Sequence, residues 1–293
     1  MIKTLPKPFR GIQRPQIERL PKRNRMTLAI GMQCKNGLLI GADTRISYYG
    51  EPISEGMKLT GFDSPSGTYV IAQSSEDVHA AHTLMGEIQA NIQACDPKTF
   101  RALESAVKDV MGAWYAPVYD NRPIVRLLLG VCLQQETEKG LYFCEPPNTA
   151  SRVYENYKAI GEGRSISDPI YDAWFKGGSP WPRHASICQL SYLMYKAKQL
   201  LPASIGGHTD VALLTEPLTV PYWITQLSME CAESWGVSFD RGLSKLVSSA
   251  IAGNQGGTEE IMTMAQGIYQ SSLTYSRLEF HCQFPDETIR HEF

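Results

Sequence analysis

The sequence predicts an α+β fold, in which runs of helices are layered on antiparallel sheets, followed by a largely helical C-terminal extension. Three observations support this prediction. Residues 27–42 alternate like two strands around Asn36-Gly37, a pair that supplies the positive φ angles of tight hairpin loops. Two consecutive segments then carry apolar residues at the 3–4 spacing of helices. The whole order is strands, two helices, strands, two helices and a strand, which favours separate helical and sheet layers.

The first hairpin brings two polar residues to the same end. Its first arm places alternate apolar residues on one face, and its second arm, 38–42, is apolar on both faces, which indicates burial. A loop centred on Lys35 would put Asp43 directly across from Thr27. A change of register by one residue would send these two side chains to opposite faces of the sheet.

The next elements follow from local patterns. Residues 46–59 are polar and turn-rich, and 68–73 form a short strand. Ser74 or Ser75 is a candidate cap for a helix with apolar residues from Val78 to Ile92, and a second helix spans 100–114. Strands are expected at 126–134, 140–144 and 154–160, helices at 167–175 and 185–201, and a strand at 209–214.

Composition divides the chain into three parts: a basic arm, 1–26, a core, 27–222, and an extension, 223–293. The first 25 residues hold eight basic side chains, one acid and four prolines, a composition that disfavours a packed element. Because these residues carry a net charge of +7 and the whole chain −2, residues 26–293 carry −9. This acidic charge argues against a nucleic-acid-binding surface. In the extension, 227–252 and 259–272 have helical patterns and 278–284 alternates like a strand. The extension packs on its own core or on a neighbouring subunit.

The sequence also indicates the compartment. No apolar run approaches the roughly 20 residues of a membrane span, and the N-terminus lacks the apolar core of a signal peptide. The seven cysteines are scattered and form no Cys-x-x-Cys pair, as reduced structural thiols do. His208-Thr209-Asp210 has no accompanying cluster of metal ligands. We therefore expect a cytoplasmic protein with no metal, no organic cofactor and no membrane or nucleic-acid partner.

Several motifs resemble one known family. A threonine that opens a strand, a hairpin, Ala42-Asp43-Thr44-Arg45, and then Met57-Lys58-Leu59 some fifteen residues later look like the start of a proteasome-type β subunit. The resemblance is closest to the bacterial ancestral-β-subunit (Anbu) group of N-terminal nucleophile hydrolases. Counted from Thr27, Asp43 falls at the family's spacing, and Lys58 falls one residue short of it. Residues 160–162 and 204–211 show a weaker similarity to the family, which extends the resemblance to about Leu214.

This resemblance implies a four-layer αββα sandwich and a threonine-type peptidase or amidase. Thr27 would be the nucleophile and its own free α-amine the base, with Lys58, Asp43 and Ser204 completing the catalytic set. Backbone N–H groups near Gln73 to Ser75 would stabilise the oxyanion. The family also implies a homo-oligomer, a ring or a helical stack, which acts on peptide or protein substrates.

The sequence departs from the family pattern at several positions. The family often has an aspartate three residues before the serine that Ser204 resembles, where this chain has Leu201. Where proteasome subunits carry a serine near the second helix pair, this chain has Glu162. Gln73 or Ser75 replaces the glycine of the oxyanion region, which narrows the substrate cleft but keeps a backbone donor.

Two questions remain open at this stage. The basic arm is a propeptide, or a retained arm that binds a subunit or an anionic partner, or an artefact of a start site that belongs at Met26. The function has alternatives too: a catalytically silent structural subunit that keeps its arm, or an amidohydrolase of the same fold that acts on small molecules.

Overall fold

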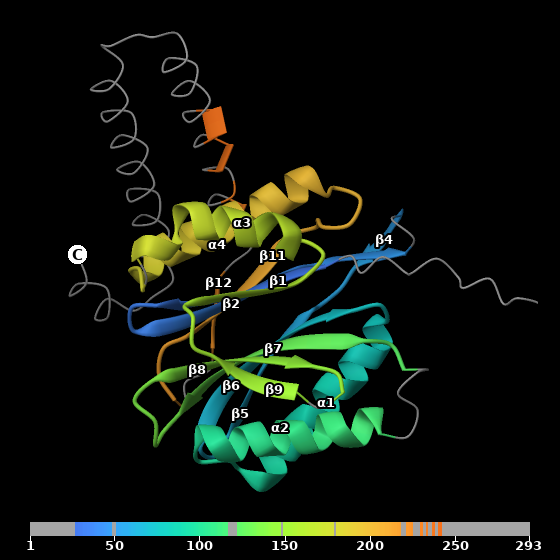
Figure 1. The fold of residues 1–293 in the computed structure, drawn as a ribbon, viewed down its shortest axis with the longest axis vertical. Coiled ribbons are helices and arrows are strands. Elements are labelled where there is room, and N and C mark those ends of the chain that lie inside the picture. The colour runs from blue at the N-terminus through green and yellow to red at the C-terminus, as the bar shows by residue number, and fades with distance from the viewer. Residues whose placement is uncertain are drawn as a thin grey trace, which may run out of the picture.

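In the computed structural model, the described residues form two five-stranded antiparallel sheets and four α-helices (Figure 1). The structure describes residues 27–48, 51–116, 122–147, 149–178, 180–217 and 221–224, and single positions from 229 to 241. Within these residues the fold is a mixed α/β arrangement with three sheets. The arm 1–26 lies outside the described residues, as do the helices and strand expected at 227–284, apart from those single positions.

The first sheet contains the hairpin and has the strand order β10-β1-β2-β11-β12. Its strands are β1 (Leu28–Cys34), β2 (Gly37–Asp43), β10 (Tyr157–Gly161), β11 (Thr209–Leu214) and β12 (Tyr222–Ile224). Strands β1 and β2 lie at its centre, which explains why the second arm of the hairpin is apolar on both faces.

The expected register of the hairpin is wrong by one residue. Ala29 pairs with Ala42 and Cys34 with Gly37, so the chain turns through Lys35 and Asn36, and only Asn36 of the expected pair has a positive φ, of 60°. This register, continued to the strand end, places Asp43 opposite Leu28 rather than Thr27. Two residues suffice to close the loop, and the positive φ falls on Asn36, a residue that tolerates the left-handed region.

The second sheet has the order β5-β6-β7-β8-β9. Its strands are β5 (Leu59–Ser64), β6 (Gly67–Ser75), β7 (Val125–Leu133), β8 (Lys139–Glu145) and β9 (Thr149–Val153). Strand β9 was not expected from the sequence. A two-stranded sheet of β3 (Arg45–Tyr48) and β4 (Glu51–Glu55) also occupies the segment that reads as polar and turn-rich, because antiparallel pairing needs only backbone groups.

The helices lie close to their expected positions: α1 (Val78–Cys95), α2 (Phe100–Tyr115), α3 (Arg164–Trp174) and α4 (Arg183–Leu200), and a short 3-10 helix spans Lys176–Gly178. The expected cap of α1 is wrong. Asp77, not Ser74 or Ser75, accepts hydrogen bonds from the N–H groups of His79 and Ala80. The two serines belong to β6, which runs two residues further than its apolar pattern indicates.

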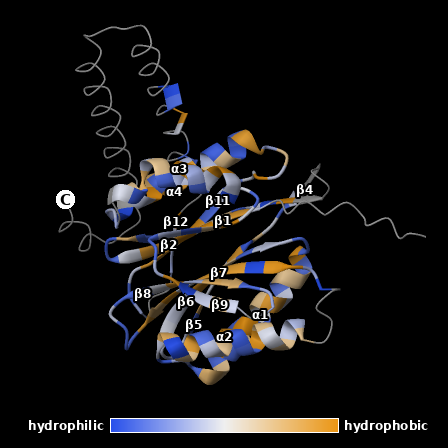
Figure 2. Cartoon of the chain, in the orientation of Figure 1, coloured by the Kyte–Doolittle hydropathy of each residue, from blue (hydrophilic) through white to orange (hydrophobic). Residues whose placement is uncertain are grey.

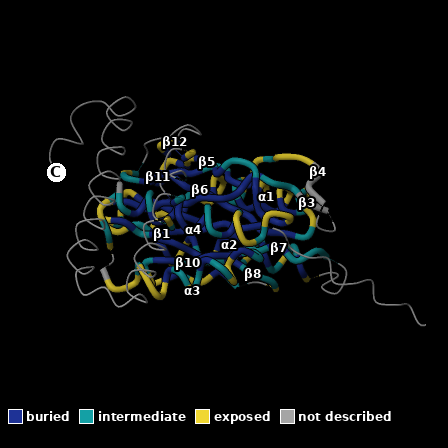
Figure 3. Tube along the Cα trace, turned by 90° about the horizontal axis from the view of Figure 1, so that it is seen from above, coloured by how far each residue is buried: buried dark blue, intermediate teal, exposed yellow. Residues whose placement is uncertain are grey.

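Three apolar clusters show how the elements are layered. One joins α1 and α2 to the second sheet, and another joins α3 and α4 to the first sheet. The third lies between the sheets and includes Ala29, Ile40, Val70 and Leu128. Figure 2 shows hydrophobic residues along the strands, and Figure 3 shows the strands as the buried interior. Fully buried side chains of this kind contribute about 1.5–3 kcal/mol each, which holds the two sheets together.

Candidate active site

A buried ion pair joins the two sheets at one end. The ammonium of Lys58, just before β5, lies 3.1 Å from Oδ1 of Asp43, the last residue of β2. Asp43 is 0% and Lys58 1% exposed. Lysine and aspartate are almost never buried so completely unless they are paired. The structure therefore brings together two of the four residues that the sequence predicts.

Backbone groups hold the carboxylate of Asp43 from two further directions. The N–H of Leu28, next to Thr27, donates to Oδ1 at 2.9 Å, and the N–H of Gly206 donates to Oδ2 at 3.3 Å. Because of the first bond, Asp43 stays beside Thr27 although the register differs from the expected one. Charge-assisted hydrogen bonds of this kind fix the orientation of a carboxylate.

Burial changes the acid–base properties of the pair. Desolvation lowers the pKa of Lys58, and the attraction of Asp43 opposes this shift. Desolvation also raises the pKa of Asp43. The ammonium of Lys58 and the N–H groups of Leu28 and Gly206 oppose this shift. An ammonium with a lowered pKa gives up a proton more easily than a lysine in water.

Thr27 is 4% exposed and lies directly before β1. Its carbonyl oxygen accepts a hydrogen bond of 3.3 Å from the N–H of Gly163, at the start of α3. Gly161 has a φ of +93°, and a Cβ atom on it would overlap the carbonyl of Thr27. Only glycine combines this conformation with such close approach. The turn 161–163 therefore positions Thr27 against the second sheet.

We expect Gly161→Ala to reduce the free energy of unfolding by more than about 2 kcal/mol, because it combines an unfavourable φ with a backbone clash. Urea unfolding of the purified protein measures the change. Gly86→Ala, in the middle of α1, is the matched control. A Cβ atom there meets nothing within 4 Å, so this substitution is expected to stabilise the protein by about 0.5–1 kcal/mol. Equal effects of the two substitutions would contradict the constraint at Gly161.

The structure places the remaining predicted residues nearby. Ser204 is 5% exposed, in the turn between α4 and β11, and its N–H donates to the carbonyl of Leu201 at 2.9 Å. It lies two residues before Gly206, so the backbone of its turn contacts Asp43. Gln73 and Ser74, at the end of β6, are buried, and the N–H of Gln73 donates to the carbonyl of Lys58 at 3.0 Å. The N–H of Gln73 therefore already has a hydrogen-bond acceptor.

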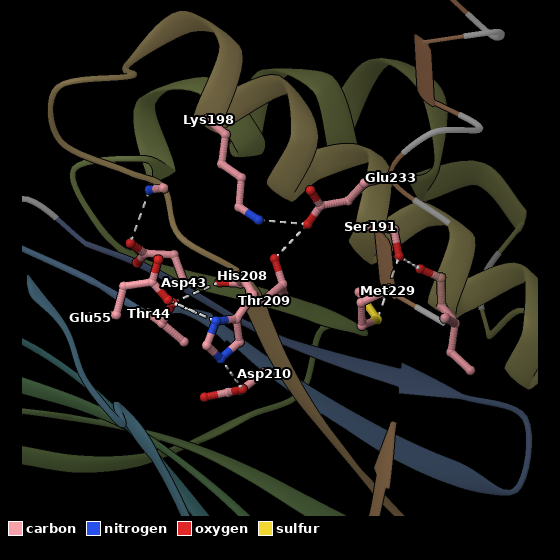
Figure 4. A network of polar contacts seen from close by, with 12 residues as sticks. Asp43, Thr44, Glu55, Ser191, Lys198, His208, Thr209, Asp210, Met229 and Glu233 are labelled. Atoms are coloured by element: carbon pink, nitrogen blue, oxygen red, sulfur yellow. Dashed lines mark hydrogen bonds and ion pairs between the residues drawn. The ribbon is translucent and has the colours of Figure 1, made fainter. Parts of the chain in front are cut away.

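A polar network beside the ion pair was not predicted from the sequence (Figure 4). Nδ1 of His208 lies 2.8 Å from Oε2 of Glu55, its Nε2 lies 3.2 Å from Asp210, and the hydroxyl of Thr44 donates to Glu55 at 3.1 Å. Desolvation raises the pKa of Glu55, but hydrogen bonds from Thr44 and His208 oppose this shift, and the pKa of Glu55 is lowered overall. This network links the two-stranded sheet of β3 and β4 to the turn that contains Gly206. Its two halves, Thr44 with Glu55 and His208 with Asp210, are far apart in the sequence, so no local pattern indicates that they meet.

The described residues contain no cluster of three or more histidine, cysteine, aspartate or glutamate side chains that could hold a metal ion. The cysteines at 34, 95, 132, 144 and 188 are free thiols, and Cys231 and Cys282 lie outside the described residues. Burial raises the pKa of Cys144 and of Cys188 to about 12, which makes both thiols unreactive. In the described part of the chain, no helix is both long and apolar enough to span a membrane.

Comparison with known proteins identifies the fold. No family model and no curated protein matches the chain. Among solved structures, an Anbu (Gly-1) mutant from Hyphomicrobium sp. strain MC1 aligns with a TM-score of 0.60 and 14% identity over 75% of this chain and 97% of the other. Anbu (ancestral beta-subunit) from Yersinia bercovieri aligns with a TM-score of 0.57 and 17% identity over 76% and 97%.

A third structure, described as the helical assembly of the Anbu complex from Pseudomonas aeruginosa, aligns with a TM-score of 0.58 and 14% identity over 75% and 96%. At these identities the likeness establishes the fold of the chain. The described core therefore shares the proteasome-like fold of Anbu proteins.

Proposed function

We propose that the chain is a threonine-type amide hydrolase with the αββα sandwich of N-terminal nucleophile hydrolases. The buried pair of Lys58 and Asp43 carries this proposal, because it lies against Leu28, the residue next to Thr27. A buried ion pair that adds little to stability is retained where a site needs its charges. The similarity to Anbu structures supports the same assignment.

The chemistry begins when Thr27 becomes the first residue of the chain. Its hydroxyl oxygen attacks the carbonyl carbon of the amide, and its own α-amine takes the hydroxyl proton. The ammonium of Lys58 stabilises the developing alkoxide, and Asp43 holds that ammonium in place. Ser204 supports the turn whose backbone reaches Asp43.

The tetrahedral intermediate then collapses as the C–N bond breaks. The proton held by the α-amine moves to the leaving amine, and an ester remains on Thr27. Water attacks this ester and releases the acid, which restores the hydroxyl. The backbone N–H of Ser75, at the end of β6, binds the oxyanion at each stage, and one well-placed donor of this type contributes about 3–4 kcal/mol. No step requires a metal or an organic cofactor.

We also propose that the protein acts as a homo-oligomer, a ring or a helical stack. The helical assembly described for the Anbu complex of Pseudomonas aeruginosa supports this. Peptide or protein chains are the proposed substrates.

Intact-mass measurement tests the proposal on protein expressed from its own gene, together with hydrolysis of fluorogenic peptides. We expect a chain that begins at Thr27 and cleaves peptide amides. A chain that keeps Met26 attached and has no activity would contradict the proposal and support a silent structural subunit. A panel of small amides separates peptide hydrolysis from small-molecule amide hydrolysis.

A further inference from the structure

Two buried polar groups near Thr27 have no hydrogen-bond partner among the described residues: Oε2 of Glu162 and the hydroxyl of Ser74. Ser74 is only 2% exposed. Most buried polar atoms in proteins are hydrogen-bonded, so an exception needs an explanation such as a catalytic role. Glu162 as a whole is partly exposed, but its Oε2 is buried, and a buried oxygen without a hydrogen bond is unfavourable.

Backbone contacts place both residues beside Gly161. Glu162 lies between Gly161, which packs against the carbonyl of Thr27, and Gly163, whose N–H donates to that carbonyl at 3.3 Å. The hydroxyl of Ser74 lies 3.1 Å from the position that a Cβ atom on Gly161 would occupy. Ser74 shares its face of β6 with Val70 and Ala72, which pack between the two sheets. Glu162 follows β10 of the first sheet and Ser74 ends β6 of the second, and both adjoin Gly161, which packs against the carbonyl of Thr27.

Two described cations close to Glu162 in space or in sequence are already bonded to other carboxylates. The ammonium of Lys58 is bonded to Asp43, and Arg164, two residues after Glu162, is bonded to Asp168. Arg45 belongs to β3, beside the turn at Gly206. The cation that the proposed function creates at this end is the α-ammonium of Thr27 itself.

We propose that the carboxylate of Glu162 binds the α-ammonium of Thr27, with the hydroxyl of Ser74 accepting a second hydrogen bond from it. This inference rests on the proposed function, since it requires Thr27 to be the first residue. Glu162 is then a positioning residue: it orients the amine beside the hydroxyl of Thr27 and takes no part in bond making. A carboxylate this close also favours the charged form of the amine, so it raises the pKa of the catalytic base.

The pKa of the Thr27 α-amine can be measured by competitive acylation at a series of pH values, followed by mass spectrometry. In protein that begins at Thr27, we expect this pKa to lie above the usual ~7.7–8.0 of an α-amino group and to fall by about one unit in Glu162→Gln. The acidic limb of the kcat/KM profile should move to lower pH by the same amount. Glu155→Gln, an exposed glutamate six residues before Gly161, is the control and should change neither. An unchanged amine pKa in Glu162→Gln overturns the inference.

The full chain provides a second test that needs no activity and no processing. There the nitrogen of Thr27 is an amide and carries no charge, and the buried oxygen of Glu162 has no hydrogen-bond partner among the described residues. Glu162→Gln is therefore expected to raise the Tm of the full chain by at least about 2 °C, whereas Glu155→Gln leaves it unchanged. A lower or unchanged Tm in Glu162→Gln means that the carboxylate already has its partner, and the inference is wrong. If no chain beginning at Thr27 is ever found, the proposed function fails and the inference fails with it. An unchanged amine pKa in Glu162→Gln that begins at Thr27 and hydrolyses peptides overturns the inference alone.

Discussion

Thr27→Ala should abolish amide hydrolysis, with a loss of at least about a thousand-fold in kcat/KM. Alanine lacks the hydroxyl oxygen that attacks the substrate in the proposed reaction. The α-amine remains, but there is no hydroxyl proton for it to accept. Side chains around the site are unaffected, because the contacts of Thr27 that the structure records are made by its backbone carbonyl. Initial rates of hydrolysis of a fluorogenic peptide measure the effect.

Two variants make this result interpretable. Thr27→Ser keeps a hydroxyl and is expected to retain measurable activity, whereas Thr60→Ala, on β5, removes a half-buried threonine away from the site and should leave the rate unchanged. Both chains, and Thr27→Ala, should begin at residue 27 and unfold at nearly the same urea concentration. Undiminished hydrolysis by purified Thr27→Ala would mean that another residue is the nucleophile.

The helices were predictable from sequence because each is long and strongly patterned. Apolar residues at 3–4 spacing define α1 and α2 almost to their ends. Strand β9 was missed because it is short and follows Pro146-Pro147, which reads as a turn. The hairpin β3–β4 was missed because its pairing depends on backbone groups and not on an apolar face.

The hairpin register was wrong for a related reason. Every residue of β2 is buried, so its apolar pattern favours neither face and cannot fix the register. The register could then be predicted only from the loop residues, and Asn36-Gly37 is compatible with two hairpin registers that differ by one residue. The pairing of Thr27 with Asp43 was therefore the weakest geometric step in the sequence-based prediction.

The candidate site was predictable only in part. The proximity of Asp43 and Lys58 depends on two strands from different sheets, which no local spacing reveals. It was expected only through the resemblance to a known family. The N–H of Gly206 bonds to Asp43, and Oε2 of Glu162 is buried without a partner among the described residues; both observations require the folded chain.

Lys58→Met is expected to reduce the free energy of unfolding by about 3–5 kcal/mol and to abolish hydrolysis. The substitution leaves the carboxylate of Asp43 buried without its counter-charge, and removing one partner of a buried ion pair has costs of this size. Urea unfolding at pH 7 gives the stability. Lys176→Met is the matched control: it breaks an exposed ion pair with Asp172 and should change stability by less than about 1 kcal/mol.

The pH dependence of Lys58→Met identifies the charge responsible. Burial raises the pKa of Asp43 in the native state, and without Lys58 the shift is opposed by the N–H groups of Leu28 and Gly206 but no longer by the ammonium. The native protein then binds a proton that the unfolded chain releases above its ordinary pKa of about 3.9, so stability falls as the pH rises from about 4 through the native pKa. The destabilisation should accordingly be largest near neutral pH and shrink on acidification.

The double variant Asp43→Asn with Lys58→Met separates stability from catalysis. Asparagine keeps an oxygen that accepts the N–H of Leu28 and removes the uncompensated charge, so most of the lost stability should return at neutral pH. Hydrolysis should not return, because the alkoxide of Thr27 still lacks the ammonium that stabilises it. Recovery of both properties would assign the pair to folding alone, whereas recovery of stability without activity retains Lys58 in the reaction.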